Sequence, residues 1–292
     1  LELVDRAADP TDGFVRYLLR SPDGALSEAV RIPLERPGRF TVCLSSQVGC
    51  AMGCDFCATG RMGLTRSLEA WEMVAAFCRV RDEAPGRITG AVFMGQGEPF
   101  ANEAEVLRAA AVLSDPCGGR ISGKAVSIST VGLVDAVRRF TDAGLPYRLI
   151  VSLTSAIPER RRRLLPVAAA HPLPDLMAAV RRHQEVIGDR VTLAWVVLGG
   201  VNTGDDEVEA LADLVAGVRV RLNLIDVNDP RPGGYRRAGE AELEAFRDGL
   251  ARLGVPVVRR YSGGSTVHAA CGMLASRPPG ASSDPVPEGR QG

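Results

Sequence analysis

The segment RFTVCLSSQVGCAMGCDFCATG, residues 39–60, joins an apolar run of alternating pattern to a loop that is dense in cysteine. Residues 39–46 place apolar side chains at every second position, which predicts a β-strand. Cys50, Cys54 and Cys57 follow with the spacing C-x3-C-x2-C, and a segment of helical period comes next. A strand, a loop and a helix in this order predict the first unit of a parallel sheet wound with helices.

The same order of strand and helix recurs along the chain beyond this segment. Further strands are expected at 88–95, 124–130, 147–154, 191–199, 219–228 and 255–262, and helices at 67–84, 101–115, 133–144, 173–188, 205–217 and 239–254. Ser67 is the expected cap of the first helix. Six strand–helix units predict an α/β fold, either a partial (βα)6 TIM-like barrel or a doubly wound sheet. No Gly-rich phosphate fingerprint opens the first helix, which disfavours the dinucleotide-binding sheet.

The two ends of the chain differ in composition from this middle part. Residues 1–38 predict a small β extension, with a Pro-Asp-Gly turn between two strand-like runs. Residues 39–275 then form the barrel, and residues 276–292, rich in Pro, Gly and Ser, are expected to be a disordered tail.

Composition limits the classes of protein to which the chain can belong. Seven cysteines in 292 residues are too few for a disulfide-stapled scaffold. The first residues lack the pattern of a signal peptide, and no apolar run approaches the roughly 20 residues that span a bilayer. We therefore expect a cytoplasmic protein with reduced thiols and no membrane partner. The net charge of zero gives no general nucleic-acid footprint, although arginines gather at 160–163 and 236–237.

The cysteine loop admits two kinds of metal site. A structural zinc site needs four ligands, which Cys43 could complete. A [4Fe–4S] cluster held by the three loop thiolates leaves one iron open to a further ligand. The spacing, placed on the first βα loop of a barrel, favours the cluster and indicates S-adenosylmethionine as that ligand.

Several longer motifs carry a resemblance to a known family. They are SSQVGCAMGCDFCATG, MGQGEP, SIST, VSL, NLIDVN and HAACGML. Over residues 13–275 the chain resembles the radical S-adenosylmethionine methylases of the RlmN/Cfr family, which methylate adenine carbons in 23S ribosomal RNA and, for RlmN, transfer RNA. The resemblance implies a radical SAM barrel, a [4Fe–4S] cluster, S-adenosylmethionine, methylation of adenine at C2, and an external reductant such as a flavodoxin or ferredoxin.

The resemblance also assigns roles to individual residues. It implies that Cys50, Cys54 and Cys57 hold the cluster. Cys271 would carry the methyl group as S-methylcysteine, Cys43 would resolve the cross-link to the base by forming a disulfide, and Glu28 would accept a proton. The positions matched to cofactor contacts are Gly97, Glu98, Ser129, Ser152, Leu153, Thr154 and Asn228.

The motifs indicate the type of reaction more directly than they indicate the substrate. Family members carry a helical N-terminal domain that helps to grip RNA, whereas 42 residues precede Cys43 here. We therefore expect weak RNA binding, supplied by the arginines at 160–163 and 236–237. One alternative is the same chemistry on a nucleotide, peptide or other small molecule, and another is a non-enzymatic zinc or cluster module. The presence of both Cys43 and Cys271 favours an enzyme over the module.

Overall fold

The fold is built on one ten-stranded sheet, seen in a computed structural model that describes residues 1–229, 231–260 and 262–275. The predicted disordered tail at 276–292 lies outside these residues. In spatial order the strands are β1 (Glu2–Ala8), β2 (Val15–Arg20), β3 (Leu26–Pro33), β4 (Arg39–Leu44), β7 (Arg87–Phe93), β8 (Val126–Thr130), β9 (Arg148–Ser152), β10 (Val191–Val197), β11 (Val220–Asp226) and β12 (Val257–Arg260). Strands β1 to β4 pair antiparallel, and every pair from β4 to β12 is parallel.

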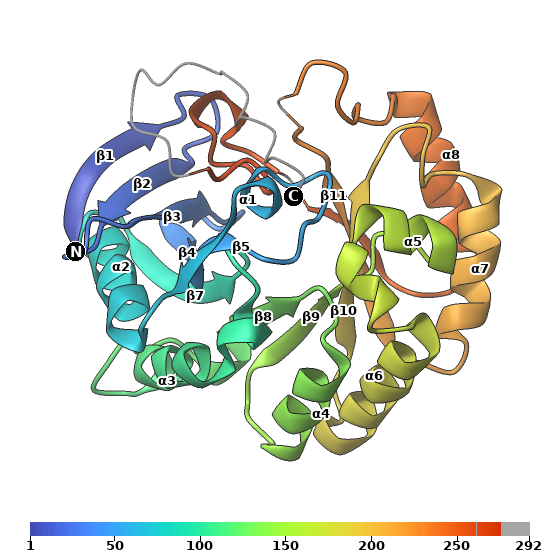
Figure 1. Ribbon diagram of the computed structural model, residues 1–292, viewed down its shortest axis with the longest axis horizontal. Coiled ribbons are helices and arrows are strands. Elements are labelled where there is room, and N and C mark those ends of the chain that lie inside the picture. Colours follow the sequence, from blue (N-terminus) through green and yellow to red (C-terminus); the bar gives the residue numbers. More distant parts are fainter. Residues whose placement is uncertain (230, 261, 276–292) are drawn as a thin grey trace, which may run out of the picture.

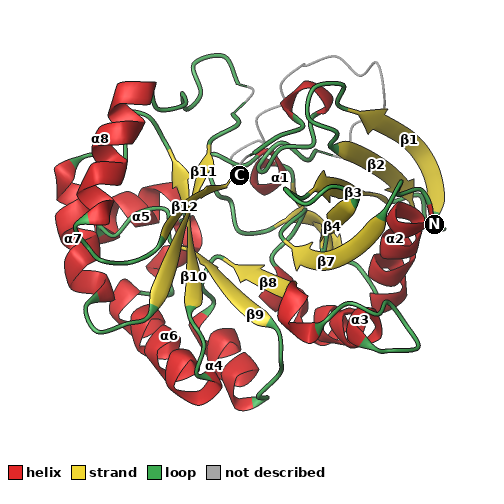
Figure 2. Ribbon diagram, turned by 180° about the vertical axis from the view of Figure 1, so that it is seen from behind, coloured by secondary structure: helices red, strands yellow, loops and turns green. Residues whose placement is uncertain are grey.

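Helices connect the parallel strands and lie along the outer side of the curved sheet (Figures 1 and 2). They are α2 (Ala70–Asp82), α3 (Glu103–Ser114), α4 (Val134–Asp142), α5 (Pro158–Leu164), α6 (Leu173–Ile187), α7 (Asp205–Val215) and α8 (Glu240–Ala251), and short 3-10 turns, among them η1 (Pro99–Asn102), join several elements. This arrangement confirms the predicted α/β fold with six strand–helix units. Among the described helices, none is both long and apolar enough to cross a membrane.

The side-chain alternation of the strands divides the core into an outer and an inner part. On β4, Val42 and Leu44 pack into the large cluster between sheet and helices, whereas Cys43 points to the inner side with Val30 and Val92. The same alternation runs through the neighbouring parallel strands, because successive side chains of a strand point to opposite faces. The inner side therefore collects side chains from β3, β4, β7, β9, β10 and β11 around a common space.

Several elements were not expected from the sequence. Among them are strand β1, helix α5, and the hairpin of β5 (Gln47–Cys50) and β6 (Gly63–Ser67) that flanks the cysteine loop. The predicted cap of the first helix was wrong, because Ser67 ends β6. Glu69 caps α2 instead, and its backbone N–H donates to the Glu72 carboxylate at 2.8 Å.

Candidate active site

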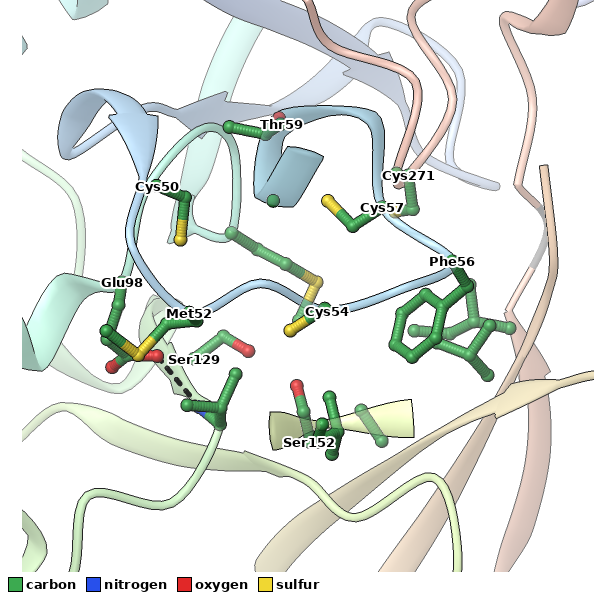
Figure 3. A pocket seen from close by; sticks show the side chains of 18 of the residues that line it. Cys50, Met52, Cys54, Phe56, Cys57, Thr59, Glu98, Ser129, Ser152 and Cys271 are labelled. Carbon is green, nitrogen blue, oxygen red and sulfur yellow. Dashed lines mark hydrogen bonds between the residues drawn. The ribbon is translucent and has the colours of Figure 1, made fainter. Parts of the chain in front are cut away.

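A pocket that is partly open to solvent lies at the carboxyl ends of the parallel strands (Figure 3). Its walls come from the cysteine loop and from the loops after β7, β8, β9 and β11, at the edge of the sheet where active sites of such barrels lie. Cys50, Cys54 and Cys57 all line it.

The β5–β6 hairpin and short helix α1 (Ala58–Arg61) give the cysteine loop its shape. Gly49 has φ +76°, and a Cβ there would lie 1.9 Å from the Gly63 carbonyl oxygen. A Cβ on Gly60 would lie 2.9 Å from the backbone of Cys54. Both glycines are therefore required by close backbone approach, not only by flexibility.

The three thiols of the loop share one space and fit an iron–sulfur cluster. The sulfur atoms of Cys50, Cys54 and Cys57 point toward the middle of the pocket (Figure 3). Within the described part of the chain, no three His, Cys, Asp or Glu side chains are close enough to hold one metal ion. Three convergent thiols suit a cluster, in which each thiolate binds a different iron.

Burial sets the protonation of these thiols while they are free. It raises the pKa of Cys50 to about 11, and it also raises the pKa of Cys54, with a smaller contribution from the neighbouring Cys57. Free Cys50 and Cys54 are therefore neutral at pH 7, and the binding of iron displaces their protons.

Glu98 lies on the wall opposite Cys271 and is almost fully buried. Its carboxylate accepts hydrogen bonds from the backbone N–H groups of Phe100 at 3.0 Å and Val131 at 2.8 Å. Glu98 thus caps the η1 turn and joins the loops after β7 and β8. Burial nevertheless raises the pKa of Glu98 to about 7, since these hydrogen bonds offset the loss of hydration only in part.

Four of the other predicted cofactor contacts line the same pocket. They are Gly97, Ser129, Ser152 and Asn228. Gly97 has φ +94°, and a Cβ there would lie 2.6 Å from Gln47 Cβ, so glycine is needed at this turn. The hydroxyls of Ser129 and Ser152, at the ends of β8 and β9, point toward the cysteines (Figure 3). The structure therefore brings these four residues together with the three cysteines.

Leu153 and Thr154 do not line the pocket. Leu153 packs in the outer core, and Thr154 is fully buried with φ +60°. The Thr154 carbonyl oxygen accepts a hydrogen bond from Asn202 Nδ2 at 2.6 Å. These two residues lie outside the pocket, because the chain turns away from it directly after Ser152.

Cys271 stands on the wall shared with a second pocket that contains Cys43. This second pocket is lined by Phe14, Val30, Cys43 and Arg260 among others, and Cys271 and Cys57 line both pockets. Cys43 is 7% exposed and Cys271 is half-buried against the same apolar cluster. Residues 228 positions apart in sequence are thus neighbours.

The protonation of Cys43 reflects opposing effects. Burial raises the pKa of Cys43 to about 12, and the nearby Cys271 thiol acts in the same direction. Arg260 lowers it, because a positive charge favours the thiolate. Arg260 was not identified from the sequence, where an arginine late in a strand carries no signal of its own.

Glu28 does not line either pocket. It lies on β3, and its Oε1 accepts a hydrogen bond from Arg16 at 3.1 Å. It is on the same side of β3 as Val30 and Ile32, which line the second pocket. The structure therefore places the predicted proton acceptor behind the pocket wall, in an ion pair with Arg16.

The structure corrects the role that was expected for Arg161. It was expected to contact RNA, yet it is 1% exposed and donates to the backbone carbonyls of Ser152 at 2.8 Å and Val131 at 2.7 Å. It forms no ion pair with a carboxylate in the described residues. A buried guanidinium here holds the strand ends β8 and β9 together, on the side of the pocket formed by Cys54. Its position within a run of four arginines concealed this role.

Carboxylates neutralise three other arginines that were expected to bind RNA. The pairs are Arg160 with Asp206 and Glu207, Arg162 with Glu159, and Arg236 with Glu242. The partners of Arg160 lie some 46 residues away in sequence, so local charge counting could not find them.

Comparisons with known proteins agree with this geometry. The family model described as the radical SAM superfamily matches residues 44–215. A protein of Anaeromyxobacter named "Probable RNA methyltransferase" is 58% identical over 92% of this chain and 80% of its own length. A Synechocystis protein named "Probable dual-specificity RNA methyltransferase RlmN" is 41% identical over 94% of this chain and 78% of its own length.

One solved structure matches nearly the whole chain. The crystal structure of a radical SAM methyltransferase from Sphaerobacter thermophilus superposes with a TM-score of 0.90 at 36% identity, covering 94% of this chain and 81% of that one. This solved structure and the present chain therefore share the fold described above. The chain belongs to the radical SAM superfamily and, within it, to the RlmN-like family of RNA methyltransferases.

Proposed function

We propose that this protein methylates C2 of an adenine in ribosomal or transfer RNA, with Cys271 carrying the methyl group. The observation that supports the proposal most is the position of Cys271, on the wall between the pocket of the three cysteines and the pocket of Cys43. A residue that receives a group on one side and passes it to a base on the other needs such a position. The names of the relatives support RNA as the substrate.

The cofactors of the chain are a [4Fe–4S] cluster and S-adenosylmethionine, as in the superfamily to which it belongs. Together, when bound, they supply a methyl group and a radical that abstracts a hydrogen atom. We assign Cys50, Cys54 and Cys57 to the cluster. We assign Glu98, Ser129 and Ser152 to S-adenosylmethionine, because a carboxylate and two hydroxyls face the same space and match its ammonium and ribose groups.

Cys43 and Cys271 complete the chemistry of the chain itself. Once the carbon of the S-methyl group is bonded to the adenine ring, the ring must lose its C2 proton and the single electron left by the radical addition, which the bound cluster would accept. The Cys43 thiolate then attacks the sulfur of Cys271, the S–C bond breaks with its electron pair going to the carbon, and a proton from solvent completes the methyl group of the released base. The products of this step are the base and a Cys43–Cys271 disulfide, which must be reduced with two electrons before the next turnover. An external reductant such as a flavodoxin or ferredoxin is proposed as the electron donor of the enzyme. Arg260 favours the Cys43 thiolate that this attack requires. Glu28, reached through movement of the wall behind which it lies, is proposed to take the proton from the ring.

The RNA reaches Cys271 through the second pocket, so the target base must leave its stack. Flipping a base costs a few kcal/mol, which contacts elsewhere on the RNA must offset. Among the arginines first expected to supply them, Arg163 and Arg237 are exposed and form no ion pair with a carboxylate in the described residues, although Arg237 donates to the Val227 carbonyl and to Asn228. We propose weak, salt-sensitive binding and a cytoplasmic location, where ribosomal and transfer RNA are found.

The substrate is tested by tritium transfer from methyl-labelled S-adenosylmethionine. RNA fragments, free adenine nucleotides and peptides are incubated side by side with reconstituted protein and a reductant. We expect label in adenine of the RNA, more at low salt than at high salt. Label in a nucleotide or peptide with none in RNA would replace the proposal by the small-substrate alternative.

Glu98→Gln is expected to weaken binding of S-adenosylmethionine by about tenfold or more, because a charge-assisted hydrogen bond to the ammonium group is lost. In the wild type the affinity should fall as the pH drops below about 7, since the Glu98 carboxylate, with its raised pKa, becomes protonated and neutral. The glutamine variant should lose this pH dependence. The measurement is anaerobic equilibrium dialysis with labelled S-adenosylmethionine between pH 6 and 8.

Glu103→Gln is the matched control for this variant. Glu103 starts α3, five positions after Glu98, and pairs with Arg139 outside the pocket. The Glu103→Gln variant should bind S-adenosylmethionine as tightly as the wild type does. Equal affinities of the Glu98 variant and this control would remove Glu98 from the binding site.

A further inference from the structure

The segment that carries Cys271, residues 262–275, has little regular structure of its own. Its one regular piece in the described chain is the 3-10 turn η4 (Ser265–Val267). A segment of this kind is held in place by its contacts with other parts of the fold. Its partners therefore decide where Cys271 lies.

Two of these partners belong to the cofactor pocket. On α1, the Ala58 N–H donates to the Gly272 carbonyl at 2.8 Å and the Thr59 hydroxyl donates to the Leu274 carbonyl at 2.6 Å. On the loop after β11, Asn228 Nδ2 donates to the Cys271 carbonyl at 3.3 Å. These contacts fix the segment on the side that faces the three cysteines.

The third partner is the turn between β1 and β2, residues 9–14, at the opposite end of the chain. Asp12 Oδ2 accepts a hydrogen bond from the Gly264 N–H at 2.8 Å, and Asp9 Oδ2 accepts one from the Thr266 hydroxyl at 2.5 Å. The other oxygen of each carboxylate accepts an N–H within the turn, from Thr11 for Asp9 and from Phe14 for Asp12. Each aspartate therefore bonds to the turn and to the Cys271 segment at once.

Close packing accompanies these hydrogen bonds. Gly264 has φ +78°, and a Cβ there would lie 2.7 Å from Ala269 Cβ and 3.0 Å from Phe14 Cβ. Phe14, Ala269 and Cys43 belong to one apolar cluster, against which Cys271 packs. The turn thus forms part of the wall of the second pocket through Phe14, and it packs against the Cys271 segment on the side of the strand that carries Cys43.

We propose that Asp9, Asp12 and Thr266 are positioning residues, and that the turn at residues 9–14 acts as a clamp that keeps Cys271 within reach of Cys43. The N-terminal strands then have a function in the reaction beyond completing the sheet. The meaning of this clamp for catalysis rests on the proposed function, whereas its effect on the distance between the two thiols does not.

The thiol distance can be measured without any methyl transfer. Dibromobimane becomes strongly fluorescent when it bridges two neighbouring thiols. The protein is purified without prior exposure to a working cluster, so that Cys271 is unmethylated, and is then reconstituted anaerobically without S-adenosylmethionine. Iron occupies Cys50, Cys54 and Cys57, and Cys78 and Cys117 line neither pocket, which leaves Cys43 and Cys271 as the neighbouring pair that the reagent can bridge. The bridged peptide is identified by mass spectrometry after digestion.

Thr266→Val is expected to lower the ratio of clamped to released segment about tenfold, because a hydrogen bond to a charged carboxylate contributes about that factor to the equilibrium constant, and bridging should become measurably slower. Thr266→Ser keeps the hydroxyl and should stay within about twofold of the wild type. Thr266 is exposed, so neither change removes a core side chain. Hydrogen exchange of residues 264–272 should rise in the valine variant and not in the serine variant.

A second pair of variants tests the aspartates. Asp12→Ala should slow bridging at least as much as Thr266→Val. Asp23→Ala is its control, since Asp23 accepts the Ala25 N–H within the next turn at 3.0 Å and pairs with Arg66. It should leave bridging unchanged.

The outcomes separate the clamp from the proposed function. Bridging at the wild-type rate in Thr266→Val and Asp12→Ala would overturn the clamp, and so would equal losses in the valine and serine variants. Wild-type protein that fails to label RNA while these variants slow bridging would overturn the proposed function and leave the clamp standing.

Discussion

Cys54→Ala is expected to lower bound iron from about four atoms per chain to near zero after anaerobic reconstitution. It should also abolish reductive cleavage of S-adenosylmethionine to 5′-deoxyadenosine. The reason is that a cluster of this kind has three protein ligands, and two thiolates cannot hold it against exchange with solvent thiols. Cys50→Ala and Cys57→Ala should behave alike, because all three sulfurs face the same space. Iron analysis, electron paramagnetic resonance and chromatography of the nucleoside measure the three effects.

Two other cysteines provide controls for this result. Cys78 lies on α2 and Cys117 is exposed in the loop after α3, and neither lines either pocket. Cys78→Ala and Cys117→Ala should retain the iron of the wild type. Purified protein that holds one zinc ion, lost on Cys43→Ala, would contradict the cluster and favour the zinc alternative.

Cys271→Ala and Cys43→Ala are expected to stop methylation at two different points. Without Cys271 no methyl acceptor exists, so RNA labelling should fall to background while iron content is unchanged. Without Cys43 the base is not released, so a covalent complex of protein and RNA should accumulate. Its formation is followed on denaturing gels, and peptide mass spectrometry locates the link at Cys271.

Wild-type protein gives the complementary observation. When it is made in cells with a working cluster, the peptide that contains Cys271 should carry the mass of one added methyl group in place of hydrogen. Unmodified Cys271 in protein that labels RNA, or a Cys43→Ala variant that turns over freely, would contradict these roles.

The barrel could be predicted because the sequence patterns that indicate its strands and helices each lie within a short segment. Each parallel strand is a short apolar run, each helix shows helical period, and the alternation on β4 that sends Cys43 inward is already visible in residues 39–46. The spacing of Cys50, Cys54 and Cys57 is local too. The position of Cys271 next to Cys43 came from the family resemblance, since nothing in spacing or period joins two residues so far apart.

The features that escaped prediction depend on contacts between distant segments. Arg160 and Arg161 are adjacent arginines that the sequence does not distinguish. Arg161 is buried under the strand ends, whereas Arg160 pairs with Glu207. Ser67 has the chemistry of a helix cap, but pairing with Gln47 makes it part of β6. From the sequence alone, Asp9 is an ordinary turn residue, and only the folded structure shows its hydrogen bond with Thr266. Tertiary contacts decided each of these cases, and local propensity did not.

The contact between Asp9 and Thr266 spans 257 residues, and that between Thr59 and Leu274 spans 215. A ribosome that has delivered the cysteine loop and several strand–helix units has therefore not yet made the segment that covers them. Joining such distant segments also costs chain entropy, which is recovered only when both ends are folded. The wall that carries Cys271 is consequently completed last in synthesis, and the cysteine loop stays accessible from that side until then. Any chain that stops before residue 262 has an open pocket.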